Sequence, residues 1–349
     1  MSPRATAFAI PGDIDTVTGG YIYERRLLEE LRVLGHDVQH IQLGASFPDP
    51  TAPDMDHAIA ALEVVPSTRA LILDGLVYGS IDTAGLARVR APIVAMIHHP
   101  LALETGLGPA QRDHLFATER ANLAMAAHVL VPSRHTADIL ARDYAVPAER
   151  ITIAQPGNRR PTGTRTPTDP PLILSVGILH PRKGHDILLR ALAEMTDTPW
   201  RAVIVGSDYD PEHARDLARL LDQLGLQGRV TLAGRIPQAE LDALFAQACL
   251  FVLATRYEGY GMVFDEALTW GLPIVSCATG AVPQTVPKDA GLLVPIDAPA
   301  PLAAAMARLL SDEGLRRTMG KAASRAGATL PTWQDTARTA GRVLDDLSD

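Results

Sequence analysis

The chain has 349 residues, nearly half of them apolar, and a formal net charge of −8. A chain of this length can bury a large core, and we expect it to divide into two domains. The acidic balance argues against broad nucleic-acid binding, which needs a basic surface. Cys249 and Cys277 each lie inside an apolar run, so we expect buried thiols rather than a disulfide framework or a zinc site.

The sequence contains no run of about 18 uncharged apolar residues, and the opening MSPRATAFAI lacks the regions of a signal peptide. We therefore expect a cytoplasmic protein. The first predicted helix carries three arginines and three glutamates, a mixture that favours a solvated face over contact with an anionic bilayer; they are Arg25, Arg26, Arg32, Glu24, Glu29 and Glu30. Peripheral contact with the inner face of the membrane stays open as an alternative.

The first half of the chain alternates strand and helix patterns. An apolar strand at 5–10 leads through Thr18, Gly19 and Gly20 into a helical pattern that stops at Gly35. Further apolar runs leave room for the crossover helices that parallel strands require, and they lie at 38–43, 70–73, 93–97 and 128–131. This half is predicted to be a doubly wound α/β domain.

A second series of the same kind follows a segment crowded with proline, threonine and charge at 161–170, which we expect to be a linker. Its predicted strands are 172–176, 202–205, 230–232, 250–254 and 273–276. We expect two Rossmann-like domains, 1–160 and 171–331, that face each other across a cleft.

The stretch 254-ATRYEGYGMVFDEALTWGLPIV-275 places Glu258 in a glycine-rich loop and Glu266 on the helix after it. The loop follows a buried parallel strand, where open α/β sheets bind ligands and where amides at a helix start accept anions. The carboxylates themselves would repel a phosphate, so they suit the hydroxyls of a sugar and a ribose. The alternative is that both glutamates are ordinary surface charges.

A second strand, loop and helix is 175-SVGILHPRKGHDILLRAL-192, with Arg182 and Lys183 just past the strand. Two cations beside a glycine can stabilise the charge that develops on a diphosphate when a glycosyl bond breaks. Taken alone the pattern is weak, because basic loop residues are usually solvated.

From end to end the chain resembles the family 4 retaining glycosyltransferases of the GT-B fold. The matching stretches are TGGYIYERRLLEELRVLGHDV, MIHH, VLVPSRHTADIL, SVGILHPRKGHDILLRAL, AVIVGS, RVTLAGRIPQAELDALF, YEGYGMVFDEALTWGLPIV and GLLVP. The most specific mark of that family is a pair of glutamates separated by seven residues, which falls here on Glu258 and Glu266. In the family a terminal segment, here 332–349, crosses back to the first domain.

The resemblance implies roles for individual residues. Catalytic roles fall on His98, Arg182, Lys183 and Glu258, and His99 is a candidate on the acceptor side. Donor contacts fall on the glycine loop, on the residue whose backbone faces the base, and on the helix start with its ribose-binding glutamate; these are Gly19, Gly20, Ile236, Gly259, Tyr260, Gly261, Met262, Val263 and Glu266. Two positions depart from the family, since Ile178 stands where arginine is common and Gln284 where glutamate is common.

The expected reaction moves a hexosyl group from a nucleotide diphosphate sugar to an unknown hydroxyl acceptor, with retention and with neither metal nor cofactor. The acceptor could be a glycan, a lipid or a small molecule, because no motif in the loops 44–56 and 102–109 indicates which of these binds. Alternatives are a non-catalytic sugar-nucleotide-binding scaffold and a GT-B sugar phosphorylase. A nicotinamide-dependent dehydrogenase fits less well, because the Gly-any-Gly-any-any-Gly fingerprint is missing from both strand-to-helix starts.

Overall fold

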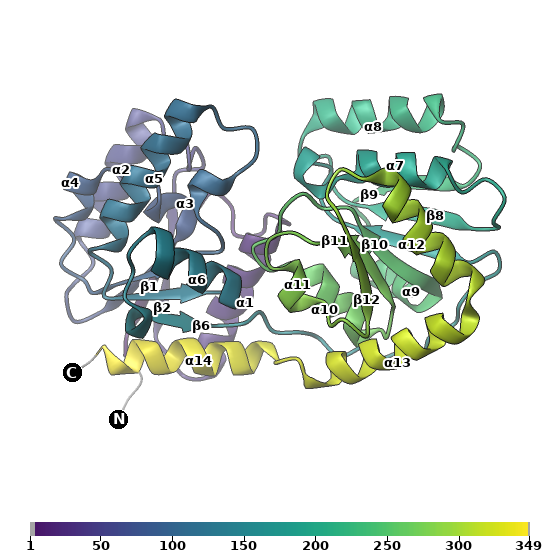
Figure 1. The fold of residues 1–349 in the computed structure, drawn as a ribbon. Helices are drawn as coiled ribbons and strands as arrows, with labels where there is room; N and C mark the ends of the chain where they lie inside the picture. The colour runs from purple at the N-terminus through teal and green to yellow at the C-terminus, as the bar shows by residue number, and fades with distance from the viewer. Residues whose placement is uncertain (1–3, 348–349) are drawn as a thin grey trace. The chain divides into compact units, whose positions relative to one another are not determined.

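A computed structural model describes residues 4–347, which form two compact units (Figure 1). The first unit joins the described parts of Met1–Gly157 and Pro331–Asp349, and the second is Asn158–Leu330. The segment 161–170, expected to be a linker, is hydrogen-bonded within the second unit. Thr166 N donates to Ala246 O at 2.8 Å, and the Arg165 guanidinium donates to the carbonyls of Ala248 and Gly271 at 2.6 and 3.0 Å.

The first unit is built on a parallel sheet with the strand order β2-β1-β3-β4-β5-β6. Its strands are β1 Thr6–Pro11, β2 Val38–Leu43, β3 Ala70–Asp74, β4 Ile93–Met96, β5 His128–Val131 and β6 Ile151–Ile153. Its helices are α1 Gly19–Val33, α2 Ala52–Glu63, α3 Gly75–Tyr78, α4 Thr83–Leu86, α5 Pro109–Leu123, α6 Arg134–Asp143 and α14 Trp333–Asp346. The doubly wound prediction is confirmed, and β6 is a strand that the sequence patterns missed.

The second unit is also a parallel sheet, with the order β12-β11-β10-β7-β8-β9. Its strands are β7 Leu172–Val176, β8 Arg201–Val205, β9 Val230–Gly234, β10 Ala248–Leu253, β11 Ile274–Cys277 and β12 Gly291–Val294. Its helices are α7 His185–Ala193, α8 Pro211–Gln223, α9 Gln238–Gln247, α10 Met262–Thr269, α11 Val282–Thr285, α12 Pro299–Ser311 and α13 Glu313–Thr329.

The central strands are apolar on both faces because helices cover both faces of each sheet. In β10, Leu250 and Val252 belong to one core, while Phe251 and Leu253 belong to the core on the opposite face. Successive side chains of a strand point to opposite faces, so a continuous apolar run is what a central strand of such a sheet requires. Both cysteines, Cys249 and Cys277, are free and buried in this region.

Each sheet has one place where the chain reverses its direction of strand addition. In the first unit this place lies between β1 and β3, and in the second it lies between β7 and β10. The loops that follow two such neighbouring strands run to opposite faces and leave a crevice at the carboxyl ends, where doubly wound folds bind ligands. The residues singled out in the sequence follow β1, β4, β7, β9 and β10.

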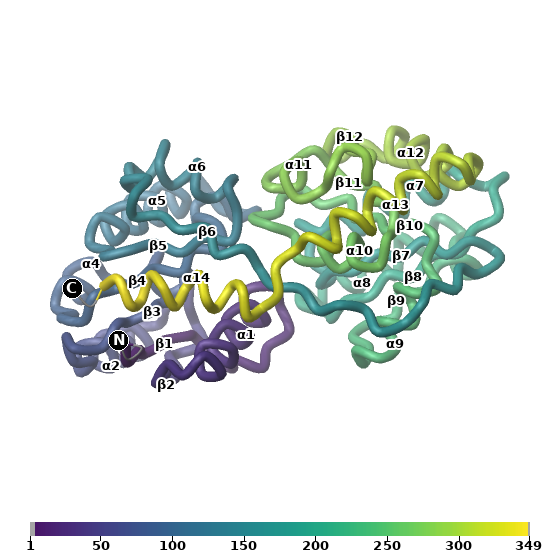
Figure 2. The backbone as a smooth tube through the Cα atoms, turned by 90° about the horizontal axis from the view of Figure 1, so that it is seen from below, coloured from purple at the N-terminus to yellow at the C-terminus, as the bar shows by residue number. Residues whose placement is uncertain are grey.

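Helix α14 packs along α1 within the first unit (Figure 2). It begins with a capping box in which Thr332 and Asp335 bond each other's backbone amides. The ring of Trp333 meets that of Tyr23 edge-on at 5.5 Å, and Thr336 Oγ1 donates to Gln155 O at 2.7 Å.

The charges of α1 are only partly a solvated face. Arg25 pairs with Asp15 and Arg26 with Glu29, both at 3.1 Å, and the Arg32 guanidinium donates to the Val38 carbonyl. Glu24, however, is 1% exposed, so the expectation that it is solvated was wrong. Across residues 4–347, we find no helix with both the length and the apolar character needed to cross a bilayer.

Replacing Gly157 with alanine should destabilise the first unit. A Cβ at this position would lie 2.1 Å from Trp333 N and 2.2 Å from its Cα, so the start of α14 would have to shift. We expect a loss of about 1–3 kcal/mol, which lowers Tm by roughly 2–4 °C for each kcal/mol. Calorimetry of the purified variant measures this. Gly228→Ala is the control, since nothing lies within 4 Å of its added Cβ; equal Tm values for the two variants would contradict the packing argument.

Candidate functional site

The loop after β7 is folded against the end of β10. Pro181–Lys183 forms a short 3-10 turn in which the His180 side chain accepts from Arg182 N at 3.2 Å. Gly184 then adopts φ +65°, and a Cβ there would lie 2.0 Å from the Ala254 carbonyl oxygen. Because only glycine permits both the conformation and the approach, this residue fixes where the two cations before it stand.

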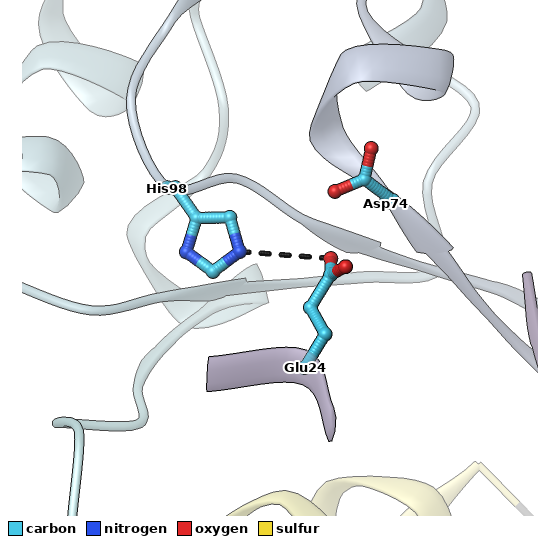
Figure 3. Close-up of side chains that lie close together, drawn as sticks. All are labelled: Glu24, Asp74 and His98. Carbon is cyan, nitrogen blue, oxygen red and sulfur yellow. Dashed lines mark ion pairs between the residues drawn. The ribbon is translucent and has the colours of Figure 1, made fainter. Parts of the chain in front are cut away.

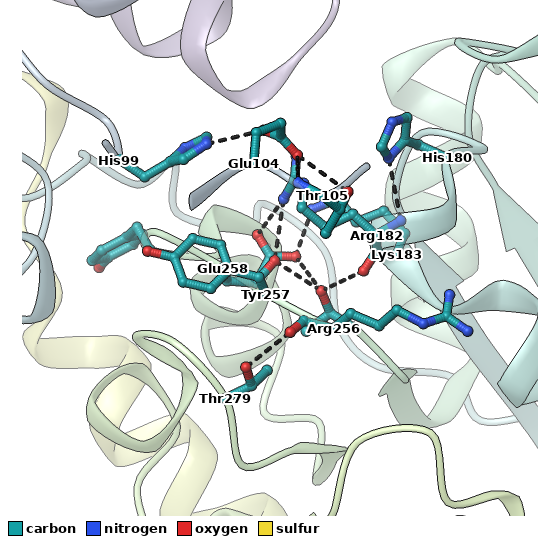
Figure 4. Close-up of polar contacts among 12 residues, drawn as sticks. His99, Glu104, Thr105, His180, Arg182, Lys183, Arg256, Tyr257, Glu258 and Thr279 are labelled. Atoms are coloured by element: carbon teal, nitrogen blue, oxygen red, sulfur yellow. Dashed lines mark hydrogen bonds and ion pairs between the residues drawn. The ribbon is translucent and has the colours of Figure 1, made fainter. Parts of the chain in front are cut away.

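The loop after β10 brings Glu258 to those cations (Figure 4). Lys183 Nζ lies 2.6 Å from Glu258 Oε1, and Arg182 Nη1 lies 3.7 Å from Oε2. Thr255 Oγ1 donates to the same carboxylate at 3.0 Å. The Glu258 carbonyl accepts from Ala281 N at 2.8 Å, and a Cβ on Gly280 would lie 2.3 Å from that carbonyl oxygen. The loop is therefore held from both sides.

The electrostatics of this cluster keep Glu258 ionised. Burial alone would raise the pKa of Glu258, but the charges of Lys183 and Arg182, with the hydrogen bonds from Lys183 and Thr255, hold that pKa below its usual value. One carboxylate faces two cations, so the cluster keeps one unit of net positive charge. This charge can attract an anionic ligand to the β7–β10 crevice.

A further arginine, which the sequence analysis missed, joins the two loops. Arg256 pairs with Asp186 at the start of α7 through two hydrogen bonds of 3.0 and 2.8 Å, and with Asp297 at 2.7 Å. Its backbone N–H donates to the Arg182 carbonyl at 2.8 Å. A paired guanidinium of this kind resists rotation, so the position of Arg182 depends on Arg256.

Helix α10 carries the second glutamate of the predicted pair. Gly261 precedes it at φ +87°, with Gly259 and Tyr260 before that residue and Met262 and Val263 opening the helix. Burial, and then the charge of Asp265, raise the pKa of Glu266 to about 7. Ile236 follows β9 and packs, partly buried, against the core on the α10 side of the sheet. The contacts predicted for these residues with a donor stay predictions.

Asp265, beside Glu266, is a buried carboxyl that the sequence analysis did not single out. It is 1% exposed, accepts from the Tyr260 hydroxyl, and accepts from Asn158 Nδ2 at 3.1 Å. Burial raises the pKa of Asp265 to about 7 against the lowering effect of these two hydrogen bonds. The aspartate ties the glycine-rich loop to the first residue of the second unit.

The raised pKa makes Asp265 a source of pH-dependent instability. The unfolded chain releases this proton near the ordinary value of 3.8, whereas the folded chain holds it to about 7. Stability from this group is therefore full below about pH 4 and is lost as the pH rises to 7. Asp265→Asn keeps the hydrogen-bonding groups, so it should weaken the fall in Tm between pH 4 and pH 8.

Thermal unfolding across this pH range measures the effect, with the exposed Asp222→Asn as the control expected to follow the wild type. A pH profile of Asp265→Asn parallel to that of the wild type would contradict the assignment.

In the first unit, the predicted glycines and histidines lie close to one another. Gly19 and Gly20 open α1, and a Cβ on Gly20 would lie 3.5 Å from His98 Cδ2. His99 Nε2 lies 3.0 Å from Glu104 Oε2.

The two departures from the family pattern lie in the second unit. Ile178 is half-buried in the loop after β7, and Gln284 is exposed on α11.

Two family patterns cover most of the chain. The pattern described as "Glycosyl transferases group 1" matches residues 159–326, and that described as "Glycosyltransferase Family 4" matches residues 72–157. The chain belongs to glycosyltransferase family 4. The resemblance to this family is thereby confirmed.

Curated relatives within the family are identical to the chain at about a third of the aligned residues. A D-inositol 3-phosphate glycosyltransferase of Xylanimonas cellulosilytica is 29% identical over 255 residues, which are 68% of this chain and 60% of the relative. The one from Mycobacterium tuberculosis is 33% identical over 214 residues, which are 59% of this chain and 44% of the relative. The chain thus spans about half the length of the curated relatives that it matches.

Solved structures match the fold over almost the whole chain. Sucrose-phosphate synthase from Thermosynechococcus elongatus gives a TM-score of 0.83 at 23% identity and covers 98% of this chain and 99% of that one. HepE from Anabaena, solved in complex with UDP, gives 0.75 at 14% identity and covers 98% and 100%. These matches confirm that the two Rossmann-like units are those of a GT-B fold.

Proposed function

We propose that the protein moves a hexosyl group from a nucleotide diphosphate sugar to a hydroxyl acceptor, with retention of the anomeric configuration. The observation that carries this proposal is the contact of Lys183 and Arg182 with Glu258 at the point where β7 and β10 diverge. The two cations of this cluster can bind a diphosphate, and its ionised carboxylate, Glu258, can accept hydrogen bonds from sugar hydroxyls.

Breaking the bond between the anomeric carbon and the diphosphate leaves negative charge on the departing oxygen. Lys183 and Arg182 are already fixed where they can neutralise that charge, and a fixed charge costs little reorganisation during the reaction. This supports a reaction that needs no metal, as expected from the sequence. In a retaining transfer the acceptor oxygen enters on the face from which the diphosphate leaves, so the departing oxygen is a nearby base for the hydroxyl proton.

Family relatives suggest which substrates to test first. HepE binds UDP, so UDP-sugars are the first donors for this chain. The curated relatives are D-inositol 3-phosphate glycosyltransferases, so a phosphorylated cyclitol is the first acceptor to try. The first domain holds the acceptor in this proposal, and the second holds the donor.

Replacing Lys183 should slow the chemical step. Lys183→Ala removes the ammonium from the leaving diphosphate, and the loss of one such group costs roughly 100- to 1000-fold in turnover. Steady-state kinetics with the best donor and acceptor measure kcat for Lys183→Ala and for the control Lys321→Ala, whose side chain is exposed on α13. Near-normal turnover in Lys183→Ala would remove this role.

Replacing Glu266 should instead weaken nucleotide binding, since a ribose contact exists in both ground and transition states. Thermal unfolding with UDP, GDP, ADP and dTDP, each with and without magnesium, should show one nucleotide standing out. A ligand at 100 times its dissociation constant stabilises by about 2.7 kcal/mol. Glu266→Ala should lose that shift, while Glu194→Ala, exposed at the far end of α7 from Lys183, should keep it.

A wild-type protein that none of the four nucleotides stabilises would count against the proposed donor. A Glu266→Ala variant with unchanged nucleotide affinity would count against the ribose contact alone.

A further inference from the structure

Three polar side chains from separate elements meet inside the first unit (Figure 3). Glu24 comes from α1, Asp74 ends β3, and His98 follows β4. One nitrogen or oxygen atom of each lies within 4.8 Å of those of the other two. The three lie near the carboxyl ends of β1, β3 and β4, beside the place where the first sheet reverses its order. The end of β3 can approach the end of β4 because Gly75 has no side chain. A Cβ on Gly75 would lie 2.7 Å from the Met96 carbonyl oxygen.

Two of the three groups are carboxyls removed from water. Glu24 is 1% exposed and Asp74 is 3% exposed. Asp74 Oδ1 accepts from Leu76 N at 2.8 Å, and an oxygen of the Glu24 carboxyl lies within 4.8 Å of an oxygen of the Asp74 carboxyl. Adjacent carboxyls that are removed from water cannot both ionise, so we expect the pair to share one proton.

Burial raises the pKa of Glu24 to about 7. Burial, and then the charge of Glu24, raise the pKa of Asp74 well above its usual value. These directions agree with a shared proton that rests mainly on Asp74, which leaves Glu24 as the ionised member that faces the histidine.

Two unsatisfied atoms face each other across the rest of the cluster. Glu24 Oε1 and His98 Nε2 are both buried without a hydrogen-bond partner, and they lie 3.6 Å apart. A shift of a few tenths of an ångström would bring them into hydrogen-bond range and satisfy both, whereas a buried polar atom left unpaired destabilises the fold. Such contacts are often long in a ligand-free site and tighten when substrate binds.

We propose that Asp74, Glu24 and His98 form a hydrogen-bonded relay in which Glu24 accepts the Nε2 proton of His98, leaving Nδ1 as the acceptor for a substrate hydroxyl. The Nδ1 atom points away from both carboxyls, and the side chain is 23% exposed although Nε2 is buried. Glu24 and Asp74 are positioning residues, since they act on the substrate only through His98. The substrate hydroxyl rests on the proposed function, while the relay itself does not.

The surroundings of the imidazole leave the two carboxyls as its polar partners among the described side chains. Tyr23 meets the ring edge-on at 5.1 Å, but its hydroxyl donates to the Ala154 carbonyl at 2.6 Å. Thr136 Oγ1 donates to the backbone carbonyl of His98 at 3.3 Å and so holds the main chain. The titratable groups facing His98 are thus Glu24, Asp74 and Tyr23, and only the carboxyls can accept its proton.

The test is the tautomer of His98 in the full chain labelled with ¹⁵N-histidine, its signals assigned by their loss in His98→Gln. Two-bond nitrogen–proton correlations distinguish Nε2–H from Nδ1–H, and we expect Nε2–H in the wild type. Glu24→Met removes the acceptor and should shift the population toward Nδ1–H. Asp74→Asn should keep Nε2–H, because its amide can donate to Glu24 in place of the shared proton.

Wild-type protein in the Nδ1–H form would overturn the relay, and so would a Glu24→Met spectrum identical to the wild type. If Glu24→Met does not fold, Glu24→Gln takes its place. Its amide oxygen can still accept from Nε2, so a loss of the Nε2–H form there would also overturn the relay. Specific broadening of the His98 signals by stoichiometric Mn²⁺ would do the same, since it would make the cluster a divalent-cation site.

Kinetics separate the relay from the proposed reaction. With a working donor and acceptor, Glu24→Met should lower kcat by roughly 10-fold, the scale of one lost hydrogen bond from the substrate hydroxyl to His98, with donor KM unchanged. Asp74→Asn should stay closer to the wild type. A Glu24-dependent Nε2–H tautomer in a protein that transfers no sugar would keep the relay and remove only the proposed substrate.

Discussion

The salt bridge between Lys183 and Glu258 is the interaction on which the second unit's site depends. It joins the loops that follow two neighbouring strands of one sheet, and buried charges of this kind persist only when they are paired and hydrogen-bonded. Around it, Thr255 satisfies the carboxylate, and Arg256 fixes the backbone of Arg182. The loops are short and rich in glycine because the pair requires their backbones to approach closely.

The sheet of the first unit also reverses its strand order, but the side chains near that place are chemically different. At its reversal point the buried charges are two carboxyls and an imidazole, and protonation rather than a cation relieves the burial of the acids. One sheet therefore presents a cationic crevice suited to an anion, and the other presents a proton-sharing cluster suited to a hydroxyl. This division matches the proposed reaction, in which the leaving group is charged and the reacting group of the acceptor is a neutral hydroxyl.

Local sequence patterns were enough to predict most strands, because strands that are covered on two faces appear as unbroken apolar runs. The loops after β7 and β10 could be predicted because each follows such a run and contains glycine. Strands β6 and β12 were missed; both lie at the edge of their sheet, and apart from Gly291 their residues are only partly buried. The role of Glu24 could not be predicted from α1, where it stands among arginines and other glutamates that are exposed or only partly buried. Its burial depends on Asp74 and His98, which come from distant segments, and the partner of Arg256 lies 70 residues away. Pairings of this kind follow from the tertiary fold rather than from spacing.

Gly184 has a consequence for how this site can change. Its backbone lies against the Ala254 carbonyl, and the neighbouring Arg182 carbonyl accepts the amide of Arg256, so neither loop can move without displacing the other. Lengthening or refolding either loop would therefore break the contacts that hold the charged pair. A change of specificity that keeps the pair in place has to come from exchanging single side chains on these loops or from altering the loops of the first unit.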